Sequence, residues 1–157
     1  MFKNLSPGAI GVAADMKQGL AYARQFGFEG LDLNIYEAQK IAEEQSIEEV
    51  KKLWDGIKMG SWTFPITWNA PEEEYREKLS HLPEIAALAA DLGCFRTAIW
   101  IPPASSEKTY QENWDFHVSR FRPIGEILAD YGHMIGLEFI GPRTSRANAK
   151  HGFVYTM

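Results

Sequence analysis

The amino-acid sequence predicts an α/β fold built from about five parallel strands with helices between them. First, short apolar segments alternate with longer segments of helical periodicity, an order typical of a parallel sheet with right-handed crossovers. Second, residues 133–142 (HMIGLEFIGP) form an apolar run closed by Gly-Pro, as expected of a strand buried on both faces. Third, residues 30–35 (GLDLNI) alternate between apolar and polar side chains, which indicates a strand with two different faces.

The first strand is expected at residues 9–13, where a short apolar run follows Pro-Gly. A helix is predicted next, from Met16 to Phe26. Asp15 is a suitable N-cap for this helix and Gly27 a suitable C-cap, so both of its ends are marked in the sequence.

The second strand, residues 30–35, carries Asp32 and Asn34 on its polar face. In an isolated sheet this face would be exposed to water. In a closed barrel it would point inward, where polar groups near the carboxyl ends of the strands line a site. Both arrangements agree with the segment, and in a barrel Asp32 could pair with Arg96.

Helical sequence is predicted over residues 36–57, with a second start at Ser46. Ser46 and Glu49 have the spacing of a capping box, which satisfies free N–H groups at a helix start. The third strand is predicted at residues 59–66, where proline ends the run.

Two long helices and a strand follow. A helix is expected over residues 71–92, where Pro83 should kink it or split it, and a strand over residues 94–101. The second long helix is predicted over residues 110–131, with a kink at Pro123. The side chains of this helix that are expected to face inward are Trp114, Val118, Phe121, Ile124, Ile127 and Leu128.

The fifth strand brings one carboxylate, Glu138, onto a face that the pattern predicts to be buried. Burying a charge is costly unless the charge is paired or binds a metal. One interpretation is a structural pair with an arginine or lysine. The other is a metal-binding or catalytic carboxylate at the carboxyl end of a barrel strand.

Composition excludes several function classes. The formal net charge of −5 argues against a nucleic-acid partner, and no apolar run is long enough to span a membrane. Cys94 is the single cysteine, so no internal disulfide is expected, and the residue is predicted to be buried. The N-terminus lacks the apolar core of a secretory signal, and we therefore expect a cytoplasmic protein.

Three segments carry a family resemblance: GFEGLDLNI (27–35), RTAIWIPPAS (96–105) and GHMIGLEFIGP (132–142). In their order and spacing they resemble the sugar phosphate isomerase/epimerase family, whose members are xylose isomerase-like (β/α)8 TIM barrels. The resemblance covers the chain as the N-terminal part of such a barrel. The expected fold is therefore a partial (β/α)8 TIM barrel over residues 1–157, a single domain without the C-terminal β/α units.

The resemblance implies a site and a chemistry. Glu138 matches the family's first metal ligand, inside a Gly-Leu-Glu pattern. By analogy it would also act as one of two acid/base carboxylates that move a proton at carbon next to a carbonyl. The implied cofactor is a divalent metal (Mn, Mg, Co or Zn), and the implied partner is a small-molecule sugar or sugar phosphate. The residues that would line the sugar pocket are Asn34, Trp62, Phe64 and Trp100.

A whole barrel needs about 250 residues, so roughly three β/α units are missing. The family's other ligands, an Asp, a His and a second Glu, have no counterpart here, and one carboxylate does not hold a divalent ion. We therefore expect the isolated chain to be inactive, a fragment or half of a split barrel. Its unpaired edge strands predict self-association or pairing with a missing C-terminal half.

Two other functions stay open. A non-catalytic binding or structural half-barrel predicts no thermal shift with metal. An AP-endonuclease-like DNA-repair enzyme shares the superfamily fold, but it needs a histidine on the third strand, where residues 61–64 read Ser-Trp-Thr-Phe. Among other polar residues, His81 and His117 are expected to be exposed on helices. His133 is expected to be structural.

Arg143 and Arg146 lie in a polar, basic segment after the fifth strand. They are interpreted as part of a solvated loop, with contact to a phosphate as the alternative.

Overall fold

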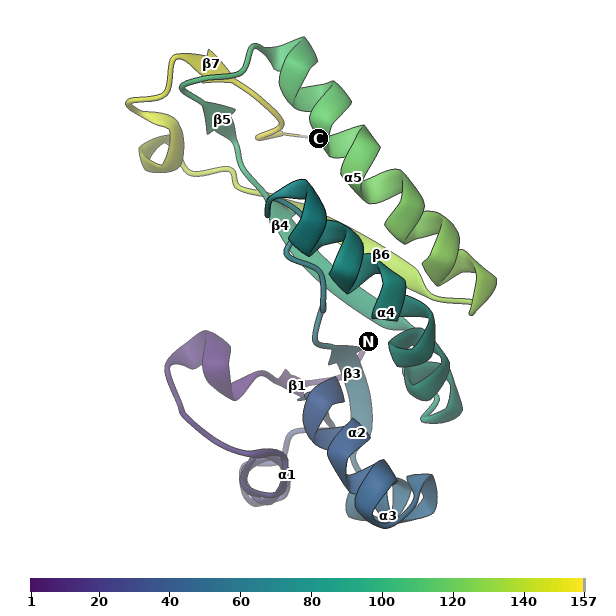
Figure 1. Cartoon of the computed structure of the whole chain (residues 1–157). Helices are drawn as coiled ribbons and strands as arrows, with labels where there is room; N and C mark the ends of the chain where they lie inside the picture. Colours follow the sequence, from purple (N-terminus) through teal and green to yellow (C-terminus); the bar gives the residue numbers. More distant parts are fainter. Residues whose placement is uncertain (157) are drawn as a thin grey trace.

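The computed structural model describes residues 1–156 and shows one curved parallel sheet with helices on its outer side (Figure 1). The sheet has five strands in the order β1-β2-β3-β4-β6, and every neighbouring pair is parallel. Its strands are β1 (Asn4–Leu5), β2 (Gly30–Leu33), β3 (Lys58–Trp62), β4 (Arg96–Ile101) and β6 (Met134–Phe139). The predicted architecture of about five parallel strands with alternating helices is confirmed.

The connecting helices are α1 (Met16–Gln25), α2 (Ile35–Glu44), α3 (Ile47–Leu53), α4 (Glu72–Asp91) and α5 (Tyr110–Asp130). Several of their starts follow from capping. The Asp15 side chain accepts a hydrogen bond from the Gln18 N–H, and the Asp15 N–H donates to Gln18 Oε1, which together form a capping box. Ser46 caps α3 as predicted by accepting a hydrogen bond from the Glu49 N–H, but the Glu49 side chain pairs with Lys52 and does not complete the predicted capping box. None of the helices in residues 1–156 is long and apolar enough to cross a membrane.

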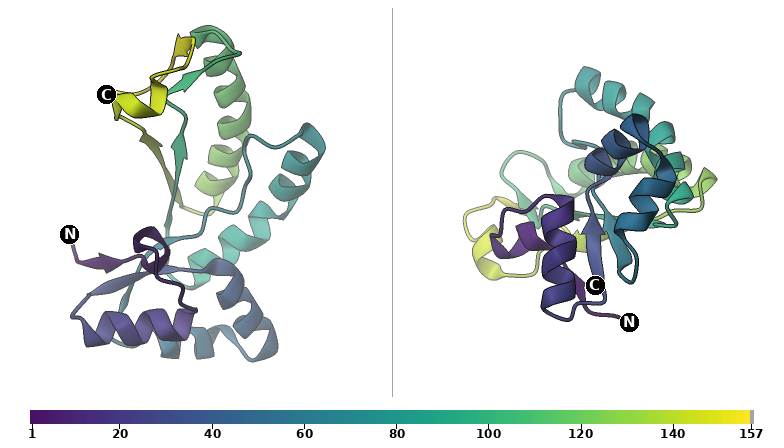
Figure 2. Two further views of the ribbon diagram at one scale, coloured as in Figure 1. Left: turned by 90° about the vertical axis from the view of Figure 1, so that its left-hand side faces the viewer. Right: turned by 90° about the horizontal axis from the view of Figure 1, so that it is seen from below.

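The hydrophobic core lies between the sheet and these helices. In β2, Leu31 and Leu33 are buried whereas Asp32 is half-buried, so the predicted alternation is confirmed. The opposite, inner face of the sheet is open to solvent (Figure 2). The largest fully buried side chains are Trp62, Leu20, Leu33, Ile35, Leu82, Ile124, Leu128, Val50 and Cys94.

The sheet is joined unevenly along its width. β4 and β6 stay in register over six residue pairs, from Arg96 with Met134 to Ile101 with Phe139. β3 and β4 share one registered pair, Trp62 with Thr97, where the Thr97 hydroxyl donates to the Trp62 carbonyl at 2.9 Å.

The prediction of a first strand at residues 9–13 is wrong. Residues Pro7–Ile10 form a short 3-10 helix that ends at Gly11 in a left-handed conformation (φ 74°). Pro7 suits the first turn of this helix, and the apolar side chain of Ile10 is 69% exposed. The real first strand, β1, is only two residues long and pairs Asn4 with Gly30.

The structure decides one alternative and corrects one prediction for the long helices. Of the two outcomes predicted at Pro83, a kink or a split, the split does not occur, because α4 runs without a break from Glu72 to Asp91. Trp114 does not face inward: it is 46% exposed and stacks on Tyr110 at the surface. Ile124 and Leu128 take the buried positions of α5, as predicted.

The fifth predicted strand, β6, is not buried on both faces. Met134, Gly136, Leu137 and Glu138 are exposed. Met134, Gly136 and Glu138 lie on the inner face, which no described element covers, whereas Leu137 lies on the other face and is exposed because β6 is an edge strand of the described sheet.

A small two-stranded sheet was not predicted. β5 (Ala104–Ser105) pairs antiparallel with β7 (His151–Gly152), and a 3-10 helix, η2 (Arg143–Arg146), lies between β6 and β7. Phe153 anchors this terminal segment: its N–H donates to the Pro103 carbonyl at 2.8 Å, and its ring is 5% exposed.

Candidate functional site

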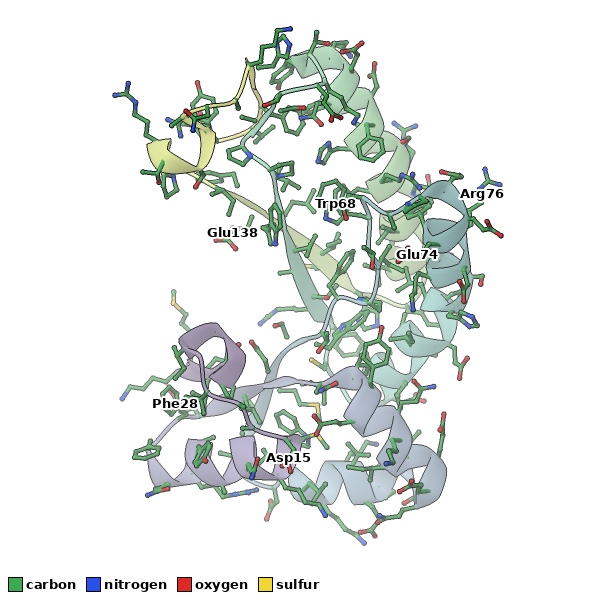
Figure 3. All side chains as sticks on the ribbon, turned by 60° about the vertical axis from the view of Figure 1, so that its left-hand side comes forward. Asp15, Phe28, Trp68, Glu74, Arg76 and Glu138 are labelled. Atoms are coloured by element: carbon green, nitrogen blue, oxygen red, sulfur yellow. The ribbon has the colours of Figure 1, made fainter. Side chains whose placement is uncertain are left out.

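The candidate site centres on Trp100 and Glu138, which stand side by side near the carboxyl ends of neighbouring strands. They are registered partners in β4 and β6, and partners in parallel strands point to the same face. Trp100 is 50% exposed and Glu138 is also exposed. Figure 3 shows Glu138 pointing away from the helices, toward the open inner side of the sheet.

Small residues surround the base of this pair. Ala98 and Gly136 are the registered partners one inward-facing position earlier in β4 and β6. Because these two side chains are only a methyl group and a hydrogen atom, the ring of Trp100 and the carboxylate of Glu138 project beyond their neighbours on the inner face. A ligand of the inner face could therefore contact both side chains at once.

A second polar group on the inner face centres on Asp32. Its Oδ1 accepts hydrogen bonds from Asn4 Nδ2 at 2.7 Å, from the Ser61 N–H at 3.2 Å and from the Ser61 hydroxyl at 3.0 Å. Asp32 thus joins β1, β2 and β3 through neutral donors. The expected ion pair of Asp32 with Arg96 is not formed among the described residues.

The Asn34 side chain serves mainly as the N-cap of α2. It accepts hydrogen bonds from the N–H groups of Tyr36 and Glu37, and its Nδ2 donates to Glu37 Oε1 at 2.7 Å. Glu37 Oε2 in turn accepts from the Met16 N–H at 2.7 Å. Asn34 also borders a pocket of about 260 Å³ beside the carboxyl end of β2, together with Asp32 and Glu37.

Trp62 and Phe64 lie on the other side of the sheet from Glu138. Trp62 is 1% exposed and packs edge-on against His133, with ring centroids 5.5 Å apart. Phe64 is half-buried and packs against the same core. In this structure the exposed surface that these two residues offer to a ligand is small, whereas Trp100 offers half of its side chain.

The two buried histidines are structural. His133 Nε2 contacts the Ala86 carbonyl at 2.8 Å, in agreement with the structural role predicted for it. The prediction that His117 is exposed is wrong: it is buried between Trp68 and Phe153, and burial lowers its pKa. Cys94 is buried as predicted, and burial raises the pKa of its thiol to about 11.

The residues present do not fit a divalent metal by themselves. Within residues 1–156, no group of three or more His, Cys, Asp or Glu side chains is arranged to hold an ion. Glu138 offers one carboxylate, and hard divalent cations take several oxygen or nitrogen ligands. No chemical step through a metal is therefore assigned to this chain's own residues.

Sequence reasoning selected Trp100 and Glu138 separately and missed that they are registered partners. The signal was present in the spacing: both lie four positions after the first residue of their strands, Arg96 and Met134, which are themselves partners. The Asn4 contact to Asp32 was missed because the first strand was placed at residues 9–13.

A family model described as xylose isomerase-like TIM barrel matches residues 20–151. A xylose isomerase domain protein from Alicyclobacillus acidocaldarius is 23% identical with a TM-score of 0.81, covering 99% of this chain and 56% of that one.

Two further solved structures have the same fold. The IOLI protein with a bound zinc atom is 15% identical, with a TM-score of 0.71 over 90% of this chain and 52% of that one. A D-psicose 3-epimerase with D-tagatose, from Clostridium cellulolyticum, is 16% identical, with a TM-score of 0.64 over 96% and 55%. The chain thus spans about half the length of these structures. No curated protein sequence matches it significantly.

Proposed function

Since this chain belongs to the xylose isomerase-like TIM-barrel family, we propose that it is the N-terminal part of a sugar or sugar phosphate isomerase or epimerase. The reaction class is proton transfer at a carbon next to a carbonyl. A D-psicose 3-epimerase and a 3-keto-D-glucoside 4-epimerase are among the proteins that share the fold, which supports a sugar as the substrate class.

The observation that carries the proposal is the registered pair of Trp100 and Glu138 on the open inner face. In the proposed reaction the Glu138 carboxylate takes the proton from the carbon next to the carbonyl, and returning it to the neighbouring carbon isomerises the sugar. Epimerisation would need a second acid/base group, supplied from outside this chain, that delivers a proton to the opposite face of the same carbon. The indole of Trp100 offers a flat apolar surface beside it, against which the carbon chain of a sugar packs while its hydroxyl groups stay in water. Asn34 is the outlying member of the proposed pocket, and Trp62 and Phe64 would support the pocket from the core side of the sheet.

The family implies a divalent metal, Mn, Mg, Co or Zn, and one protein of this fold is described with a bound zinc atom. We propose Glu138 as the ligand that this chain would contribute. The other donors would come from a second polypeptide or a second copy, because the described residues hold no complete donor set.

We propose that the chain alone is inactive and that a partner covers the edges of its sheet. β1 and β6 are the edge strands, and an apolar pocket of about 260 Å³ lies beside β1. The residues that line this pocket are Leu5, Pro7, Ile10, Val12, Tyr22, Phe26 and Phe28. Unpaired edges and exposed apolar surface favour association with further strands. A single domain and a cytoplasmic location remain parts of the proposal.

The test is to combine the chain with the C-terminal half of a barrel of the same fold, such as the Alicyclobacillus protein. Proton exchange at the carbon next to the carbonyl is followed by NMR in D2O, with Mn²⁺ and a panel of ketoses and ketose phosphates. We expect exchange in the mixture and none with either half alone. Glu138→Gln should abolish exchange, whereas Glu126→Gln, an exposed carboxylate on α5, should leave it unchanged.

Exchange that is catalysed by the chain alone would contradict the proposed inactivity. Exchange in the mixture that survives Glu138→Gln would contradict the proposed role of Glu138. A mixture that forms a stable complex but exchanges no proton with any sugar would favour the non-catalytic half-barrel.

A further inference from the structure

A second pocket lies in the terminal segment after β6, and its charge is unusual for this chain. Residues 139–156 contain Arg143, Arg146 and Lys150 but no aspartate or glutamate, although the whole chain has a formal net charge of −5. Arg143 and Arg146 line a pocket of about 280 Å³. The other residues that line it are Ala104, Ala147, Ala149, Gly152 and Tyr155.

The Arg146 guanidinium is held in place by two contacts. It lies over the ring of Tyr155, 4.1 Å from the centroid, and its Nη1 donates to the Gly141 carbonyl at 2.5 Å. The stacking contact and the hydrogen bond fix the plane of the guanidinium group, so the directions of its remaining N–H groups are also fixed. Binding an anion would therefore cost little side-chain entropy.

Arg143 supplies a second cation without a protein partner. In the part of the chain that the structure describes, the ion pairs use Lys40, Lys51, Lys52, Arg76 and Arg120. Arg143 and Arg146 form none there, and among residues 1–156 no carboxylate lines their pocket. Two guanidinium groups that share a pocket without a counter-charge are suited to an oxyanion with several oxygens.

The terminal segment is firmly seated, so the pocket does not depend on a free tail. Ala104 of β5 pairs with Gly152 of β7, and both residues line the pocket. The next residue, Phe153, packs against Tyr110 at 5.4 Å and His117 at 4.8 Å between ring centroids. These contacts hold Tyr155 and η2 near each other.

We propose that Arg143 and Arg146 bind the phosphate group of a phosphorylated sugar. That the phosphate belongs to the substrate rests on the proposed function. Arg143 follows Glu138 by five residues, a span of at most about 17 Å for extended chain, and both lie at the same end of the sheet. The pocket therefore selects for ketose phosphates over free ketoses, with the phosphate in the η2 pocket and the carbon chain toward Trp100.

The test uses inorganic phosphate as the first probe and measures its binding to the whole chain by NMR titration at constant ionic strength. Shifts are expected in residues 141–155, and Arg143→Ala with Arg146→Ala should weaken binding about ten- to hundredfold. Arg146→Lys should also weaken binding, because lysine keeps the charge but loses the planar fork. The matched control, Lys17→Ala with Arg122→Ala, removes two exposed charges elsewhere and should leave binding unchanged.

A second arm separates this inference from the proposed function. A ketose phosphate should bind to the Glu138→Gln variant about as tightly as to the original chain, and more tightly than the free ketose does. Phosphate that binds equally to the control and to the arginine double variant overturns the inference, since it then reports only general charge. Phosphate binding that is lost in the double variant, in a chain for which no sugar exchange is ever found, supports the pocket and refutes the proposed function alone.

Discussion

Gly60 in β3 leaves room for the Asn4 side chain, and replacing it by alanine tests how much that contact contributes to stability. A Cβ at Gly60 would stand 2.6 Å from both Cγ and Nδ2 of Asn4, so the amide has to move. Asn4 then loses the 2.7 Å hydrogen bond that it donates to the Asp32 carboxylate. This bond is the side-chain link between β1 and β2.

The magnitude follows from two opposing effects. A hydrogen bond to a charged group contributes about 1.5–3 kcal/mol, and because Asn4 is exposed we take the lower end. Gly60 does not have positive φ, so alanine there stabilises by about 0.4–1 kcal/mol through the unfolded chain. Gly60→Ala should therefore destabilise the protein by roughly 1 kcal/mol.

The assay is a double-mutant cycle with Asn4→Ala, measured by urea unfolding of the four proteins. With Asn4 already truncated there is no amide to displace, so Gly60→Ala should then stabilise by about 0.4–1 kcal/mol. The expected coupling between the two sites is about 1.5 kcal/mol. If Gly60→Ala has the same effect in both backgrounds, the contact between Gly60 and Asn4 contributes nothing and the reasoning is refuted.

Three further predictions concern titration, thiol reactivity and association. Burial lowers the pKa of His117 below its ordinary value of about 6.5, so its contribution to stability is complete above that pH and is lost as the pH falls toward the lowered value. His117→Phe should flatten the dependence of the unfolding free energy on pH between about 7.5 and 5, and an unchanged slope would contradict this. Burial raises the pKa of the Cys94 thiol to about 11, so Cys94 should react with a disulfide reagent at pH 8 only after unfolding in urea. Rapid labelling of the folded chain would contradict this, because it would show that the thiol is accessible to solvent. Leu137 is exposed on the edge strand β6, so Leu137→Lys should reduce the concentration-dependent association of the chain in sedimentation velocity. Val12→Lys, beside β1, tests in the same assay whether the other edge of the sheet also associates.

Local signals in the sequence predicted the helices well, because their starts are set by residues close in the chain. Asp15 and Ser46 cap α1 and α3, and α5 begins at a capping box of Thr109 and Glu112. β1 escaped prediction because two residues carry no periodicity, and it is defined by its pairing with β2 instead. The β5–β7 pair escaped for the same reason, since its strands are 46 residues apart at the register of Ser105 with His151.

The site was predicted only in part. Alternation correctly put Glu138 on one face of its strand, but it does not say whether anything covers that face. The family resemblance predicted four aromatic and polar residues beside Glu138, but the structure places them on different sides of the sheet. Trp100 is exposed on the inner face, whereas Trp62 lies in the core. A tryptophan at the end of a strand has the same local pattern in both cases, and only the register of β3, β4 and β6 distinguishes them.

Because β3 and β4 share a single registered pair, we expect the sheet to open locally in two parts, although one hydrophobic core joins them. Backbone ladders protect amide protons from exchange, and here one ladder is nearly interrupted while its neighbour, β4 with β6, is continuous. The amides of β4, β6 and the helix α5 behind them should therefore exchange as one cooperative unit, and those of β1, β2 and α1 as another. Thr97, which forms the registered pair with Trp62, marks the boundary between the two units, and we expect local opening of one unit to end there.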